Sequence, residues 1–108
     1  MRRFTPLLIA SLLTGCAHDL TQHDRIMRKI ETVMELPAKA YPLFAYRRYY
    51  AASNADPDLV IGVYEHGGRP TRLWTEWNEL PILLDGGCSV IHVTFRRSTG
   101  RIESTRCN

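Results

Sequence analysis

The residues that could do chemistry in this chain of 108 residues are few and scattered. A helical zinc site uses two histidines at positions i and i+4, and the spacing of the histidines here does not match that pattern. The four histidines are His18, His23, His66 and His92. Of these, His92 lies in a predicted strand, where we interpret it as an exposed or partly covered strand residue. The sequence therefore predicts no metal site and no cofactor.

A catalytic nucleophile is not indicated either. A reactive serine needs a base and an orienting group beside it. Ser89 and Ser104 could lie near His92 in one hairpin, but the chain has no Gly-x-Ser-x-Gly segment. Glu76 and Glu79 are interpreted as solvated loop acids rather than as a catalytic pair. We therefore predict that the protein is not an enzyme and has no catalytic residue.

The start of the chain has the order of a secretory signal peptide. Arg2 and Arg3 form a positive head, and residues 4–13 are mostly apolar. That run is shorter than the roughly 20 residues needed to cross a bilayer. For the segment up to Cys16, the two simpler interpretations are an ordinary secretory signal peptide and an N-terminal helix with a buried cysteine. Pro6 and Gly15 disfavour the helix because both residues break helices.

The segment Leu13-Thr14-Gly15-Cys16 resembles the lipobox of bacterial lipoproteins. In that family the cysteine thiol receives a diacylglycerol, the signal is cut before the cysteine, and the new amine is acylated. The resemblance implies that residues 1–15 are removed, that Cys16 carries the lipid, and that residues 16–20 form a tether. Ala17 stands where an aspartate would favour the inner membrane. The resemblance thus implies a partner membrane: the periplasmic face of the outer membrane.

The charge of the mature chain is small. The whole chain has 14 basic and 11 acidic residues, a net charge of +3. Arg2 and Arg3 leave with the signal, so 12 basic residues remain and the net charge falls to about +1. This balance, in that compartment, gives no support for a nucleic-acid partner.

Two cysteines remain once Cys16 carries the lipid. Cys88 and Cys107 are an even number of thiols in an oxidising compartment, which predicts one disulfide between them. Such a bond would stabilise the fold by about 3 kcal/mol in the chain-entropy model. A metal pair and a redox pair are the alternatives, and the absence of a Cys-x-x-Cys segment disfavours both.

After the tether, residues 21–108 of the mature chain predict a single α+β domain. Residues 21–37 predict an N-terminal amphipathic helix that Pro37 ends. A membrane-surface helix is the alternative, although its basic residues are balanced by acids. The apolar face of this helix is Ile26, Met27, Ile30, Val33 and Met34.

Strand patterns follow the helix. Packed together, they predict an antiparallel sheet of four or five strands covered by the helix. The register of the last hairpin stays open: Gly100 favours a type I turn with a bulge, whereas facing Phe95 with Ile102 favours no bulge. The predicted strands are residues 43–52, 58–66, 71–77, 88–97 and 101–107.

Aromatic and arginine residues alternate in the first strand. Tyr46, Arg48 and Tyr50 share one strand face, and Tyr, Trp and Arg dominate protein-binding hot spots. We predict that these three residues form a binding surface, with Arg48 in solvent or paired with a carboxylate at the rim of the sheet. The alternative is that they are core and edge aromatics. Trp74 and Trp77 are expected on opposite faces, one under the helix and the other exposed.

The end of the chain carries a second resemblance. The segments Asp85-Gly86-Gly87-Cys88 and Cys107-Asn108 are similar to a C-terminal pattern of small, uncharacterised bacterial envelope proteins. That resemblance implies no activity. We therefore predict a small membrane-anchored periplasmic lipoprotein that serves as a non-catalytic binding or envelope-structural module, with a protein partner in the envelope. The alternative is an inhibitor or immunity protein against a periplasmic enzyme or a toxin.

Overall fold

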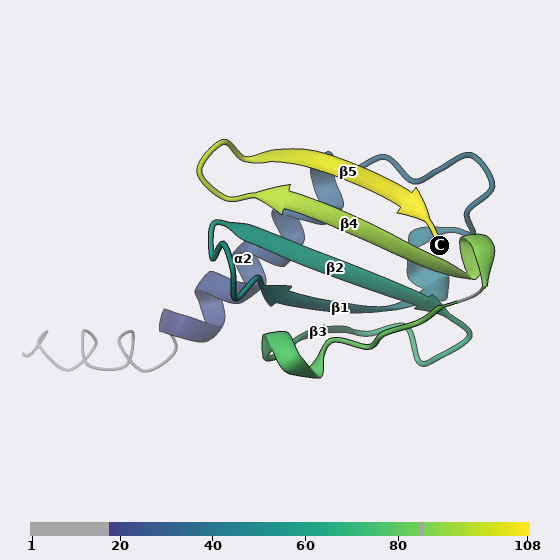
Figure 1. Cartoon of the computed structure of the whole chain (residues 1–108), viewed down its shortest axis with the longest axis horizontal. Coiled ribbons are helices and arrows are strands. Elements are labelled where there is room, and N and C mark those ends of the chain that lie inside the picture. Colours follow the sequence, from purple (N-terminus) through teal and green to yellow (C-terminus); the bar gives the residue numbers. More distant parts are fainter. Residues whose placement is uncertain (1–17, 85) are drawn as a thin grey trace, which may run out of the picture.

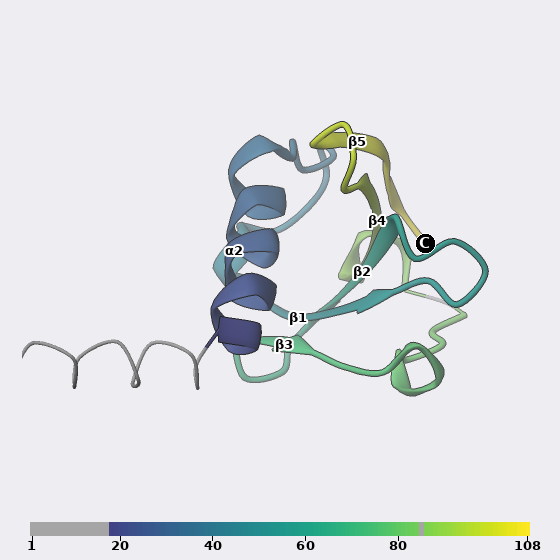
Figure 2. The same cartoon turned by 90° about the vertical axis from the view of Figure 1, so that its left-hand side faces the viewer.

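A computed structural model of the chain describes residues 18–84 and 86–108. One helix, α2 (His18–Val33), crosses one face of a five-stranded sheet (Figures 1 and 2). Expectations for residues 1–17, Cys16 among them, and for Asp85 lie outside the described residues. The strands are β1 (Tyr46–Ala52), β2 (Leu59–His66), β3 (Arg72–Trp74), β4 (Val90–Arg96) and β5 (Arg101–Cys107), and short 3-10 turns are η1 (Leu43–Ala45), η2 (Trp77–Glu79) and η3 (Gly87–Ser89).

The sheet is mixed, so the prediction of a purely antiparallel sheet is wrong. Its order is β3-β1-β2-β4-β5, and β3 runs parallel to β1 while the other neighbours are antiparallel. The free edge of β2 is taken by β4, so β3 cannot form a hairpin beside β2. The chain instead passes the end of β1 and adds β3 to the far edge. Among the described residues, the α+β class is confirmed, with one helix and a five-stranded sheet.

The helix also differs from the N-terminal helix predicted over residues 21–37. It begins at His18, inside the segment expected as a tether, and ends at Val33. Met34 still donates its amide to Ile30 at 2.9 Å, and then the chain turns. Leu36 precedes a proline, which disfavours the helical conformation, and it packs against the core together with Met34.

The main core lies between α2 and the sheet. Burial of the apolar side chains in this core is the main stabilising contribution to the fold. Gly62 sits between two core tyrosines, because a Cβ there would lie 3.1 Å from the Tyr50 ring and 3.3 Å from the Tyr64 ring. The core comprises Met27, Ile30, Tyr46, Tyr50, Val60, Tyr64, Ile91, Val93 and Phe95.

The last hairpin settles the register left open by the sequence. Phe95 pairs with Ile102, as a turn without a bulge would require, yet the register shifts by one residue between Thr94 and Phe95. Gly100 adopts a φ of 69°, the left-handed conformation that a side chain disfavours. The extra residue is Glu103, which reaches Arg96 on the neighbouring strand.

Candidate functional site

The three residues expected to form a binding surface lie under the helix instead. Tyr46 and Tyr50 are fully buried and Arg48 is 3% exposed. Arg48 does pair with a carboxylate, but its partner is Glu31 of α2 rather than a group at the rim. The prediction of a Tyr46–Arg48–Tyr50 surface is therefore wrong, because α2 supplies the charge that allows an arginine into the interior.

Around Glu31 the buried groups form a closed network. Arg48 Nε donates to Glu31 Oε2 at 2.9 Å, and the Tyr50 hydroxyl donates to the same oxygen at 2.7 Å. Arg72 Nη2 lies 3.4 Å from Glu31 Oε1. Tyr50 and Tyr64 share a hydrogen bond of 2.6 Å, and burial raises the pKa of both hydroxyls well above the usual value. Both carboxylate oxygens are thus occupied, which gives the network a structural role.

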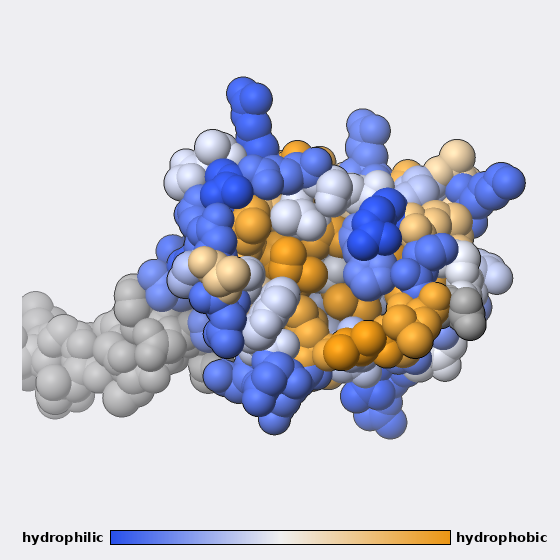
Figure 3. Space-filling view, viewed as in Figure 1, coloured by the Kyte–Doolittle hydropathy of each residue, from blue (hydrophilic) through white to orange (hydrophobic). Residues whose placement is uncertain are grey.

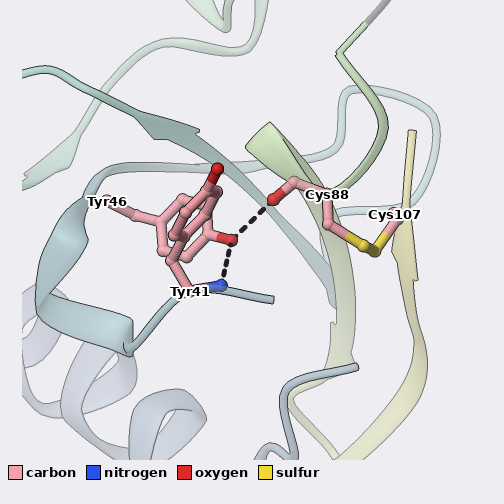
Figure 4. The surroundings of a disulfide bond; sticks show 4 residues. All are labelled: Tyr41, Tyr46, Cys88 and Cys107. Atoms are coloured by element: carbon pink, nitrogen blue, oxygen red, sulfur yellow. Dashed lines mark hydrogen bonds between the residues drawn. A yellow bond between two sulfur atoms is a disulfide. The ribbon is translucent and has the colours of Figure 1, made fainter. Parts of the chain in front are cut away.

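A disulfide fastens the far end of the sheet (Figure 4). Cys88 and Cys107 are bonded, with Cα atoms 4.5 Å apart, as the sequence predicted. The Tyr46 hydroxyl donates to the Cys88 carbonyl at 2.6 Å and accepts the Tyr41 amide at 3.0 Å. The bond therefore ties β5, the start of β4 and the chain entering β1 into one corner.

Residues 77–84 form a strap on the helix-free face of the sheet. In Figure 2 this segment and α2 lie on opposite sides of the strands. Its end is clasped by Asn108, whose side chain donates to the Leu83 carbonyl at 2.6 Å. The amide of Asn108 in turn donates to the carbonyls of Gly87 and Val90. Because Asn108 follows Cys107 directly, the disulfide also fixes the clasp.

Between the strap and the sheet lies a groove of about 600 Å³, which we call the strap groove. That volume is in the range of sites that take small ligands or several side chains. Two strap side chains stay almost fully exposed, Ile82 at 85% and Leu84 at 84%. Figure 3 shows apolar surface gathered over this face. Its apolar lining includes Ile61, Val63, Trp77, Leu80, Ile82 and Leu83.

One end of the strap groove is polar and basic. His92, Arg106 and Asn108 line it, and no Asp or Glu is among the described lining residues. His92 Nε2 is buried and has no hydrogen-bond partner among the described residues. Burial, and then the charge of Arg106, lower the pKa of His92, against a hydrogen bond to Asn108. This end can receive a polar or anionic group.

No family model, curated protein or solved structure matches this chain. The site is thus interpreted from its own geometry. Within residues 18–84 and 86–108, no group of three His, Cys, Asp or Glu side chains is placed to hold a metal ion. In the same part of the chain, no helix combines the length and the apolar character needed to span a bilayer.

Sequence reasoning missed the strap groove but correctly predicted the exposure of two residues that line it, Trp77 and His92. Trp74 stacks on His23 of α2 with ring centroids 4.2 Å apart, whereas Trp77 is 38% exposed and lines the groove. His92 is half-buried, in agreement with a partly covered strand residue. The signal that could have found the site is the apolar run at residues 80–84, which lacks strand alternation and had no assigned place in the core.

Proposed function

We propose that this protein is a small lipoprotein, held by a lipid on Cys16 at the periplasmic face of a bacterial outer membrane, and that it acts as a non-catalytic binding module. The lipobox segment supports the anchor, and the disulfide fits an oxidising compartment. The strap groove is the single observation that carries the binding role. A large apolar hollow with a few convergent polar groups is the form that ligand sites usually take.

The occupant we propose is an extended peptide segment of an envelope protein, with apolar side chains and a carboxylate. Apolar walls suit its side chains, and the exposed Ile82 and Leu84 would lose contact with water on binding. Arg106 and the vacant Nε2 of His92 complement an acid, since no acidic side chain lines the described groove. The amide of Asn78 can pair with a peptide group.

Trp77 gives a direct test, because a peptide that fills the groove covers its ring. A synthetic Val/Leu-rich hexapeptide with a free C-terminal carboxylate should shift Trp77 fluorescence to shorter wavelength in a saturable way. The same peptide with an amidated end should bind about fivefold more weakly, the upper range for one exposed ion pair. Arg106→Gln should remove that difference between the two peptides.

Matched variants distinguish binding in the strap groove from nonspecific hydrophobic binding. Ile82→Ser should weaken both peptides roughly tenfold, as expected for losing the burial of one large aliphatic side chain. Val33→Ser changes an exposed apolar residue at the end of α2 and should leave affinity unchanged. Trp77→Phe should abolish the signal although Trp74 remains. Equal loss in the Ile82 and Val33 variants, or binding of a fatty acid but not of either peptide, would overturn the proposed occupant.

Anchoring is tested separately at Cys16. Changing Cys16→Ser removes the thiol that would take the lipid, so fatty-acid labelling should disappear and uncut precursor should accumulate. Gel mobility and radiolabelled palmitate report both effects. Cleavage and membrane association that continue unchanged in the serine variant would show that the chain is not a lipoprotein.

A further inference from the structure

A second groove, on the opposite face from the strap, is lined by cations. It lies between α2 and the hairpin that joins β4 to β5, and its volume is about 430 Å³. We call it the basic groove, and no step of the proposed peptide binding uses it. Its main lining residues are Gln22, Arg25 and Lys29 from α2, with Phe95, Arg97 and Gly100 from the hairpin.

The acids described near this end of the molecule, from residue 22 onward, are already paired. Asp24 binds Arg28 and Arg72, while Arg96 collects Asp56, Asp58 and Glu103. Hydrogen bonds from Ser98 and the Arg96 guanidinium lower the pKa of Asp58, which keeps that carboxylate ionised. The surplus charge is therefore positive: in the part of the chain that the structure describes, no ion pair is formed by Arg25, Lys29, Arg97 or Arg101.

The floor of the basic groove is apolar. Phe95 is 3% exposed and Ile26 is half-buried beneath the cations. Lys29 lies beside the turn, since a Cβ built at Gly100 would be in ordinary contact with it, 4.0 Å from the ammonium. A rim of cations over an apolar floor matches a phosphate joined to glycerol and acyl chains better than it matches a fully hydrated small anion.

The basic groove also lies where a membrane would be. Its helical residues fall between the second and the fourth turn of α2, within about 17 Å of His18 at 1.5 Å per residue. In the sequence, Cys16 is two residues before His18, where α2 begins. The start of α2 and the β4–β5 turn lie at the same end of the molecule, away from the C-terminus, and Figure 2 looks onto that end.

We infer that the basic groove binds the phosphates of anionic lipid headgroups and so holds α2 and the β4–β5 hairpin against the membrane. The choice of membrane rests on the proposed lipid anchor, whereas the headgroup site rests on the groove itself. Each lysine or arginine near an anionic surface strengthens association roughly fivefold. This contact would fix the orientation of the domain and turn the strap groove away from the lipid.

The test uses the full chain in bicelles of neutral phosphatidylcholine, with isotope-labelled amides observed by NMR. Adding phosphatidylglycerol should shift amides of residues 22–29 and 95–101 in a saturable way. The variant Arg25→Glu/Arg97→Glu should lose these shifts, with affinity at least about twentyfold lower. Lys39→Glu/Arg69→Glu makes the same change in net charge at exposed residues outside the groove and should behave as wild type.

The outcomes separate the sources of the anion and the two proposals. Loss of the shifts in both double variants would mean a diffuse charge effect and would overturn the site. Equal shifts with inorganic phosphate at the same concentration would overturn the assignment to lipid. The Cys16→Ser chain in the same bicelles should still respond to phosphatidylglycerol. The anchor can therefore fail while the headgroup site stands, and the reverse result is equally distinguishable.

Discussion

The two faces of the sheet each carry a polar residue in mid-strand, and they treat it in opposite ways. On the covered face Arg48 is 3% exposed and its guanidinium meets Glu31 at 2.9 Å and the Tyr46 carbonyl at 3.1 Å. On the strap face His92 is half-buried, and its Nε2 has no partner among the described residues. Each is the third residue of its strand, so position in the strand does not distinguish them.

The difference lies in what covers each face. Helix α2 brings a carboxylate and a row of apolar residues, so every strong charge that it buries there finds an opposite charge. The strap is irregular, with Pro81 within it, and it leaves both a hollow and an unsatisfied nitrogen. A buried polar group whose hydrogen-bond partners lie within the chain stabilises the fold. One without such a partner can accept or donate a hydrogen bond to another molecule.

Removing the buried ion pair of Arg48 and Glu31 should have the largest effect on the free energy of unfolding. Glu31→Gln removes the negative charge but keeps the size of the side chain, so Arg48 stays buried without its counter-charge. Losing one partner of a buried pair costs about 3–5 kcal/mol. We expect a loss of about 3 kcal/mol in the free energy of unfolding, measured by urea denaturation.

Two comparisons sharpen that measurement. Asp24→Asn breaks pairs on a side chain that is 43% exposed, and we expect it to cost less than about 1 kcal/mol. The double variant Glu31→Leu/Arg48→Met should recover much of the stability lost in Glu31→Gln, since two apolar groups leave no buried charge. A Glu31→Gln protein as stable as wild type would mean that the network is not desolvated.

The disulfide should have the next largest effect, and it acts on the strap face. Replacing both cysteines, Cys88→Ala/Cys107→Ala, opens a loop whose ends are 19 residues apart and should cost about 3 kcal/mol in unfolding free energy or less. Because Asn108 clasps Leu83 beside this bond, peptide binding to the strap groove should weaken more than stability alone requires.

Hydrogen exchange distinguishes the two effects of that variant. Faster exchange confined to amides near the clasp, with the covered face still protected, would locate the loosening in the strap. Uniformly faster exchange in all strands with unchanged peptide affinity would show that the disulfide stabilises the domain as a whole and does not shape the groove.

The sequence predicted what local periodicity controls. Met27 and Ile30 recur at helical spacing, and both are core residues of α2. The burial of Arg48 could not be predicted in this way, because its partner Glu31 is 17 residues away on another element. The position of the parallel edge strand β3 could not be predicted for a similar reason, since it depends on which edge of β2 is already occupied.

The strap shows a different limit of sequence reasoning. Pro81 and two following glycines are typical of an irregular segment. Such a segment has no period from which its path can be derived. Gly86 and Gly87 both adopt positive φ, 120° and 53°, so they direct the chain into η3 and the Cys88 corner. The path of the strap is fixed by that corner and by the Asn108 clasp, both of which are tertiary contacts.

The smallest expected effect concerns the pH response of His92. Burial and the neighbouring Arg106 lower the pKa of this histidine below its ordinary 6.5. Between the lowered pKa and 6.5 the unfolded chain binds more protons than the folded one, so stability should fall as the pH drops through that window. His92→Gln should reduce this fall, and Arg106→Gln should raise the pKa of His92 and reduce it in part. The acid-tipped hexapeptide should also raise that pKa, because its carboxylate favours the protonated ring, whereas the amidated peptide should not. NMR titration of the His92 ring measures the pKa in the wild type, in Arg106→Gln and with each peptide, and urea denaturation across the same pH window compares the stability of the wild type with that of both variants. A ring that titrates at 6.5 or above without peptide would mean that its nitrogen is already satisfied, and the contrast with Arg48 would then disappear.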